Sequence, residues 1–344
     1  MNAYQHLKIM CNKDFVRKAA ADDLSRVITD IPFRLKYVMA RVRSGQHDMF
    51  TASNGTVGHN FYRFIDIGAP TTVVFVAHHD VARHGIQNCN DNTASVCHLL
   101  ELAERFSKQR KMLKHNVAIA WVDYEEECDS TIAGASQLAR VIKRGDFARV
   151  TAVLNLELTS CGDLYWYSAK GPYGDIHSHL LDLKFDDVFC PLNDAFHLDA
   201  NGVAATCIGS YRAKDRKVVV DQQRCGCELW MSCHKDSDTV EKWANPKEMA
   251  VFNDLLFRMP IDLVSDEDAV YDYDKQYEEP LAVNLPIFGT VKKEDDVVID
   301  DDFYTAPYQP EPIPLTLEER VEQLELIVVR QQKMIEQLQL TGKE

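Results

Sequence analysis

Histidines and carboxylates occur in this chain where they could bind metal ions. His78-His79-Asp80 directly follows the continuous apolar run 73–77, which is typical of a buried strand. Ligands and catalytic groups in open α/β sheets gather at the carboxyl ends of strands. A neutral imidazole and a carboxylate delivered together to such an edge are what a zinc site needs. The sequence therefore predicts a metal site where this strand ends.

Four more groups with ligand chemistry follow in order. Two neighbouring metal ions need about two histidines, a bridging carboxylate, a terminal carboxylate each and a free carboxylate as base. Each group alone is a weak signal, because a lone His at a strand end is usually structural and a Glu triplet usually begins a solvated helix. Together with His78-His79-Asp80, the four groups supply the ligands and the base that two metal ions need, with none left over. They are Asn90-Asp91-Asn92, Asp123-Tyr124-Glu125-Glu126-Glu127, Asn155-Leu156-Glu157-Leu158 and Cys233-His234-Lys235-Asp236-Ser237-Asp238-Thr239.

The elements that must position these groups alternate along the chain. Apolar runs predict strands over 72–77, 117–122 and 150–156, and three of the groups lie at strand ends. Helical spacing of apolar residues predicts helices over 93–109, 132–144 and 246–257. Strand–helix alternation of this kind predicts a three-layer α/β/α sandwich around a central mixed, mostly parallel sheet.

Composition excludes several functional classes. The net charge is −15, but the segment 262–314 holds 15 acidic residues and 3 lysines, so −12 of that charge lies there. The remainder is close to neutral and lacks the basic stripe of a nucleic-acid surface. We see no apolar stretch that could span a membrane and no signal peptide at the start. The ten scattered cysteines then indicate reduced thiols and a cytoplasmic location.

The chain after the predicted catalytic domain, residues 1–262, changes character twice. Residues 263–314 are acidic and contain repeated prolines, which predicts a mostly disordered linker. Residues 315–344 predict a coiled-coil helix, because seam residues step by four and three in turn. The alternative for this helix is folding back on the catalytic domain. The seam residues are Leu317, Val321, Leu324, Val328, Gln331, Ile335 and Leu338.

The five groups resemble the pattern of the zinc exopeptidase superfamily. They are most similar to the bacterial leucyl aminopeptidase family, which also holds glutamate carboxypeptidase II and the glutaminyl cyclases. The resemblance runs from about Val73 to Lys242, and includes 92–96 after the bridging position and 193–205 near the substrate pocket. Only 13 positions separate His78 from Asp91 (91 − 78), and 77 separate Glu157 from His234 (234 − 157). Those intervals leave no room for the inserted domains of some relatives, so the single-domain version is expected.

The resemblance implies roles for individual residues. His78 and Glu157 would bind one zinc ion, and Asp91 would bridge it to a second. Asp80 would orient the His78 ring, and His79 receives no role. Glu126 and His234 would complete the second zinc site, and Glu125 would be the general base.

Three departures bear on this assignment. The triplet 125–127 leaves the register open, because the base and ligand could instead be Glu126 and Glu127. The segment 128–136 is longer than its counterpart in the family. Glu157 replaces the Asp common in aminopeptidases and is one methylene longer.

The resemblance implies a hydrolase that cleaves a peptide or small amide bond at a chain end. The alternatives are a one-zinc enzyme, either glutaminyl cyclase-like or an amidase, and a non-catalytic scaffold that keeps the fold and assembles through its coiled coil. No nucleic-acid or membrane partner is expected.

The seam predicts a homo-oligomer, a dimer or a trimer, through residues 317–338. Gln331 interrupts an otherwise apolar seam, and such a polar position selects register and oligomer number. Light scattering should find an oligomer for the full chain and a monomer, with its activity intact, after truncation near Pro314. A monomeric full chain at micromolar concentration would instead assign the seam to another partner.

Overall fold

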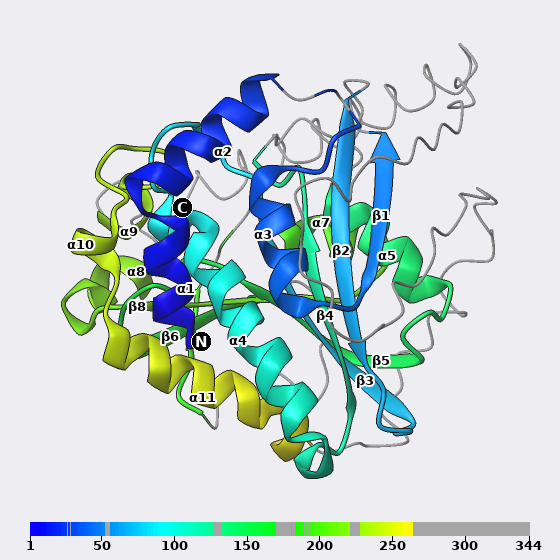
Figure 1. The fold of residues 1–344 in the computed structure, drawn as a ribbon. Coiled ribbons are helices and arrows are strands. Elements are labelled where there is room, and N and C mark those ends of the chain that lie inside the picture. The colour runs from blue at the N-terminus through cyan, green and yellow to red at the C-terminus, as the bar shows by residue number, and fades with distance from the viewer. Residues whose placement is uncertain are drawn as a thin grey trace, which may run out of the picture. The chain divides into compact units, whose positions relative to one another are not determined.

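In the structure, a computed structural model, the described residues form an eight-stranded sheet (Figure 1). It describes residues 1–25, 27, 29–51, 56–126, 133–169, 180, 183–188, 190, 193–220 and 228–263. The predicted linker and coiled coil, from residue 264 onward, lie outside the described residues. The strands are β1 (Gln46–Thr51), β2 (Val57–Ile65), β3 (Thr71–His78), β4 (Asn116–Val122), β5 (Arg149–Leu156), β6 (Leu164–Ala169), β7 (Asp186–Asp187) and β8 (Thr206–Tyr211).

The strand order places the parallel strands in the middle of the sheet. The order is β1-β2-β4-β3-β5-β8-β6-β7. Strands β4, β3, β5 and β8 pair in parallel, whereas β2 joins β4 and β6 joins β8 in antiparallel fashion. The carboxyl ends of β3, β4 and β5 therefore meet at one edge, as the sequence predicts.

Helices cover both faces of the sheet. Helices α3 and α4 pack on one face with α1 and α11 beside α4, and α5 and α7 pack on the other (Figure 1). The predicted mixed, layered α/β sheet is confirmed. The helices are α1 (Ala3–Met10), α2 (Lys13–Ser25), α3 (Phe33–Val42), α4 (Ala94–Lys108), α5 (Gly134–Lys143), α7 (Asp194–Ala200), α8 (Arg216–Val220), α9 (Glu228–Met231), α10 (Val240–Trp243) and α11 (Pro246–Asp262), with short turns η1 (Cys89–Thr93), η2 (Arg110–Met112) and η3 (Ala213–Asp215).

One predicted boundary differs from the structure. Helix α11 continues five residues beyond the predicted end at Phe257 and contains Pro260. Pro260 has no N–H to donate, but its carbonyl accepts a hydrogen bond from Lys114 N at 3.2 Å. His115 Nε2 lies 3.0 Å from the carbonyl oxygen of Leu263, which further ties down the helix end. Tertiary contacts therefore extend the helix past the residue where sequence rules would end it.

Stacked aromatic rings join the sheet to the two longest helices of one face. Phe75 of β3 stacks on Phe106 of α4, with ring centroids 5.8 Å apart. Phe106 in turn stacks on Phe257 of α11 at 5.2 Å. All three side chains are buried. This stack fixes α4 and α11 over the strand that ends in His78.

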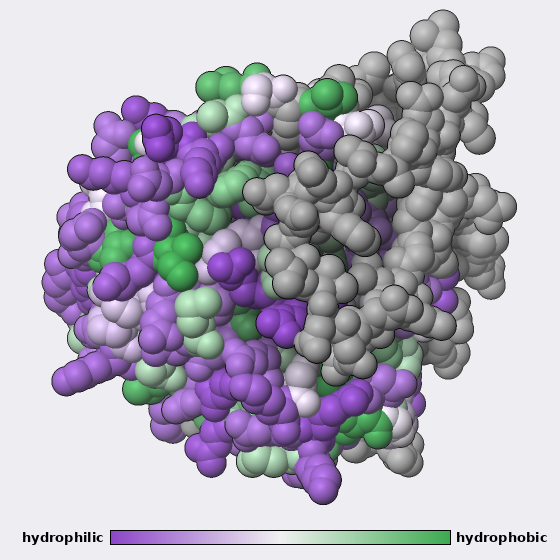
Figure 2. Space-filling view, in the orientation of Figure 1, coloured by the Kyte–Doolittle hydropathy of each residue, from purple (hydrophilic) through white to green (hydrophobic). Residues whose placement is uncertain are grey.

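Figure 2 shows a mainly hydrophilic face on which apolar residues are scattered. The cysteines of the described part (11, 89, 97, 161, 190, 207 and 233) form no disulfide bond with one another. In the same residues, no helix combines the length and apolar character needed to cross a membrane.

We expect Phe106→Ala to lower the free energy of unfolding by about 3–5 kcal/mol, because it removes the centre of the stack and leaves a cavity. Urea denaturation followed by circular dichroism measures this loss. Met112→Ala is the matched control, since Met112 is 52% exposed and its truncation should change stability by less than about 0.5 kcal/mol. Equal effects of the two substitutions would contradict the assignment of Phe106 to the core.

Candidate metal centre

Three neighbouring strands deliver ligand side chains to one edge of the sheet. His78 is the last residue of β3, and Glu157 directly follows β5. Glu125 and Glu126 lie three and four residues beyond the end of β4. Because these strands are parallel neighbours, residues far apart in sequence converge without any long connection.

The imidazole of His78 is surrounded by carboxylates. Its Nε2 lies 3.5 Å from Asp91 Oδ1 and 3.7 Å from both Glu125 Oε2 and Glu157 Oε1. Burial alone would lower the pKa of His78, but Glu157 and Glu125 raise it well above its usual value. The ring therefore sits in a strongly negative environment that favours a cation.

The other oxygen of Asp91 faces a second histidine. His234 Nε2 lies 3.1 Å from Asp91 Oδ2 and 2.8 Å from Glu126 Oε2. These two carboxylates raise the pKa of His234 to about 10. Asp91 thus stands between two ligand sets, one with His78 and Glu157 and one with His234 and Glu126.

The separations around His78 fit metal coordination better than direct hydrogen bonding. Within the described residues, His78 Nε2 has no hydrogen-bond partner although it is buried. Two ligands of a tetrahedral zinc ion lie about 3.3 Å apart, close to the 3.5 Å between His78 and Asp91. The candidate ligand atoms of His78, Asp91 and Glu126 all lie within 4.8 Å of one another. The donor set of imidazole nitrogens and carboxylate oxygens is one that zinc accepts.

The structure brings together the residues that the sequence assigned to the site. Glu126 faces His234, and Glu125 faces His78. Glu127, on which the alternative register depends, lies outside the described residues. Burial raises the pKa of Glu125 well above its usual value, and its location beside His78 leaves it close to both ligand sets.

Asp80 connects the two histidine environments. Its Oδ1 lies 3.3 Å from His78 Nδ1, and its Oδ2 accepts a hydrogen bond from the backbone N–H of Glu126 at 3.1 Å. A proton on Nδ1 leaves the lone pair of Nε2 directed at Asp91 and Glu157. His79, which received no role, is structural: its Nε2 lies 2.8 Å from the carbonyl oxygen of His59.

The loop that carries Asp91 is held from two directions. Asp238 accepts hydrogen bonds from the backbone N–H groups of Asn90 at 2.8 Å and Asp91 at 3.1 Å. Asn92 donates through its side chain to the carbonyl oxygen of Leu156 at 2.8 Å, which ties the loop to β5. The peptide bond between Asp91 and Asn92 is cis. Asp238 therefore links the Asp91 loop to the His234 loop, a role that sequence reasoning did not assign.

Asp194 is a second residue without a role in the sequence analysis. It lies at the start of α7, is fully buried, and neither of its oxygens has a hydrogen-bond partner among the described residues. Burial raises its pKa well above the usual value, and nearby Glu157 adds to that effect although His78 opposes it. The resemblance of residues 193–205 to a substrate-pocket segment was the only sequence signal for it.

The site opens on the side of His234. The His234 side chain is 50% exposed, whereas that of His78 is buried. Among the candidate ligands His234 is therefore the one that solvent reaches, because the side chains of Glu126 and Glu157 are only 6% and 8% exposed.

Comparison with known proteins agrees with this geometry. Residues 62–201 match the sequence model of Peptidase family M28. No curated protein matches the sequence. The match includes His78, Asp91, Glu125, Glu126 and Glu157, and His234 lies beyond it.

Solved structures with the same fold are distant in sequence. The LapA aminopeptidase of Legionella pneumophila has a TM-score of 0.52 and 16% identity, covering 76% of this chain and 70% of that chain. The glutaminyl cyclase of Porphyromonas gingivalis has a TM-score of 0.51 and 16% identity, covering 72% and 97%. A Zn-dependent exopeptidase from Parabacteroides distasonis has a TM-score of 0.50 and 14% identity, covering 74% and 99%.

The structural neighbours establish the fold, and the family match covers residues 62–201. The expected resemblance to the zinc exopeptidase superfamily is confirmed at that level.

We expect Asp238→Ala to weaken zinc binding by roughly 10- to 100-fold, because Asn90 and Asp91 lose the acceptor that holds their backbone. Competition with a chromogenic chelator measures the zinc Kd. Asp236→Ala is the control: Asp236 is two residues away and 76% exposed, and it makes no such contact. Equal zinc affinity in the two variants would contradict a positioning role for Asp238.

Proposed function

We propose that this chain, whose residues 62–201 match Peptidase family M28, is a di-zinc exopeptidase. It would hydrolyse a peptide or small amide bond at a free chain end, as an aminopeptidase does. The observation that carries the proposal is the position of Asp91, whose two oxygens face two separate histidine–carboxylate sets. A single carboxylate between two such sets is the arrangement expected for a bridging ligand.

His78 and Glu157 would hold one zinc ion and His234 and Glu126 the other, with Asp91 shared. Bound zinc ions supply water activation near neutral pH and polarisation of the scissile carbonyl. Asp80 keeps the His78 ring in the orientation that binding requires.

Glu125 is the residue that we assign to proton transfer. It would accept a proton from the attacking water and pass that proton to the departing amine. The raised pKa of its carboxyl, caused first by burial, suits a group that must hold the proton between these two steps. Its oxygen lies 3.7 Å from His78 Nε2, which is close enough to the ligand set for this role.

A glutaminyl cyclase-like activity with one zinc ion is the second candidate. The neighbour from Porphyromonas gingivalis shares the fold over 97% of its own length, which is more than the 70% of LapA. The two candidates differ in metal content and in product, so one preparation can distinguish them.

Elemental analysis of the full chain, purified without chelator, should find about two zinc ions per chain. Aminoacyl reporters should be cleaved, and glutaminyl peptides should not cyclise. Glu125→Gln should keep both metal ions and lower kcat by about 100-fold or more, because it removes the base and not a ligand. His78→Ala is the matched comparison and should lose metal together with activity.

Other outcomes identify the alternatives. One zinc ion with pyroglutamyl product would replace the proposal with the cyclase. Intact metal and abolished turnover in Glu126→Gln, with metal loss in Glu127→Gln, would shift the register by one residue. A metal content near zero after zinc is added back would reject the whole ligand assignment and favour a scaffold.

A further inference from the structure

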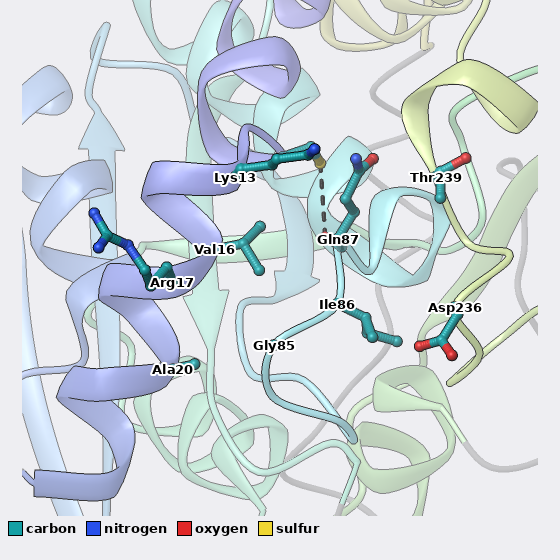
Figure 3. Close-up of a pocket in the computed structure, with 10 residues that line it drawn as sticks. Lys13, Val16, Arg17, Ala20, Gly85, Ile86, Gln87, Asp236 and Thr239 are labelled. Carbon is teal, nitrogen blue, oxygen red and sulfur yellow. Dashed lines mark hydrogen bonds between the residues drawn. The ribbon is translucent and has the colours of Figure 1, made fainter.

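A cavity lies between helix α2 and the two loops that carry Asp91 and His234 (Figure 3). Its volume is about 500 Å³. One wall is the face of α2, another is the segment Gly85-Ile86-Gln87, and Asp236 and Thr239 form a third. It is lined by none of the residues that we assign to the metal ions.

The body of the cavity is apolar. Val16 and Ala20 are one helical turn apart, so they share one face of α2. Figure 3 shows both side chains directed from α2 toward the segment of Ile86. Ile86 is half-buried there. These three side chains suit an aliphatic group a few carbons long.

Two hydrogen-bond donors of the lining have no acceptor among the residues that the structure describes. The ammonium of Lys13 makes no ion pair or hydrogen bond with any described residue. Gln87 accepts a hydrogen bond at Oε1 from the backbone N–H of Val240 at 2.8 Å, and its side-chain N–H groups donate to no described residue. Both residues line the cavity, and both carry N–H donors of the kind that bind a carboxylate.

The other charges of the lining are already paired. Asp236 Oδ1 lies 3.2 Å from Arg83 Nη1, and Arg17 Nη2 lies 3.3 Å from Asp14 Oδ1. The unneutralised charge of the lining is therefore the positive charge of Lys13. An occupant that complements the cavity carries one negative group and an apolar tail.

We propose that this cavity binds a small aliphatic carboxylate at a site separate from the metal centre. The carboxylate accepts hydrogen bonds from Lys13 and Gln87, and the alkyl chain packs on Val16, Ala20 and Ile86. Because Gln87 is also bonded to Val240, an occupant fixes the 85–87 segment against the chain that follows the His234 loop.

The test is a ligand-observed NMR titration of the full, zinc-loaded chain with hexanoate. We expect saturable binding with a Kd on the order of 1 mM, given the small size of the ligand. Hexylamine, which has the same tail and the opposite charge, should not bind. N-acetylleucine separates the two natural sources of such a group: tighter binding than hexanoate indicates a peptide C-terminus, and weaker binding indicates a short-chain fatty acid.

Substitutions on α2 test whether hexanoate binds in the cavity. Ala20→Trp should abolish hexanoate binding by filling the apolar body, and Lys13→Glu should weaken it at least tenfold. Lys18→Glu, an equally exposed change on α2 outside the lining, should leave the Kd unchanged. Hexanoate binding that survives both Ala20→Trp and Lys13→Glu would place the anion elsewhere, for example at the metal centre. That result, or no binding at 10 mM hexanoate, a concentration about tenfold above the expected Kd, would overturn the proposal.

Discussion

The burial of several carboxylates at one edge of the sheet is the constraint on which the rest of this structure depends. Burial opposes the charged form of Glu125, Glu157 and Asp194, and raises the pKa of each. Buried charges of one sign persist only when a cation or a set of donors compensates them. The two histidines provide part of that compensation. Backbone N–H groups that donate hydrogen bonds to Asp80 and Asp238 provide another part, and these bonds also fix the loops in place.

Several residues beside the site hold backbone conformations that side chains rarely adopt. Tyr124, Leu158 and His234 have φ values of 63°, 54° and 60°. His234 is a candidate ligand, and Tyr124 and Leu158 directly adjoin Glu125 and Glu157. A non-glycine residue in this left-handed region costs on the order of 1 kcal/mol, so such conformations persist only where the surroundings enforce them. The hydrogen bonds around the loops therefore aim the side chains as well as join the elements.

Sequence reasoning predicted which side chains converge because their strands end at the same edge of the sheet. His78 and Glu157 follow the strand-like segments 72–77 and 150–156, and the parallel pairing of these strands then brings the two residues together. It could not identify the duty of Asp238, because that depends on the Asn90 and Asp91 N–H groups, nearly 150 positions away in the chain. The register of the Glu triplet was undecidable from three identical residues. Helix α11 extends beyond its predicted end because its contacts with residues 114 and 115 outweigh the low helix propensity of Pro260.

The candidate metal centre also depends on Gly209, a residue that carries no ligand group. A Cβ atom at this position of β8 would lie 2.2 Å from the carbonyl oxygen of Glu157 and 2.5 Å from the ring of Trp166. The neighbouring strand can approach the ligand-bearing residue only because this position has no side chain. A single methyl group there would displace the backbone of Glu157 or the buried indole. Substitution of Gly209 is therefore expected to disturb Glu157, a candidate metal ligand, although Gly209 itself carries no functional group.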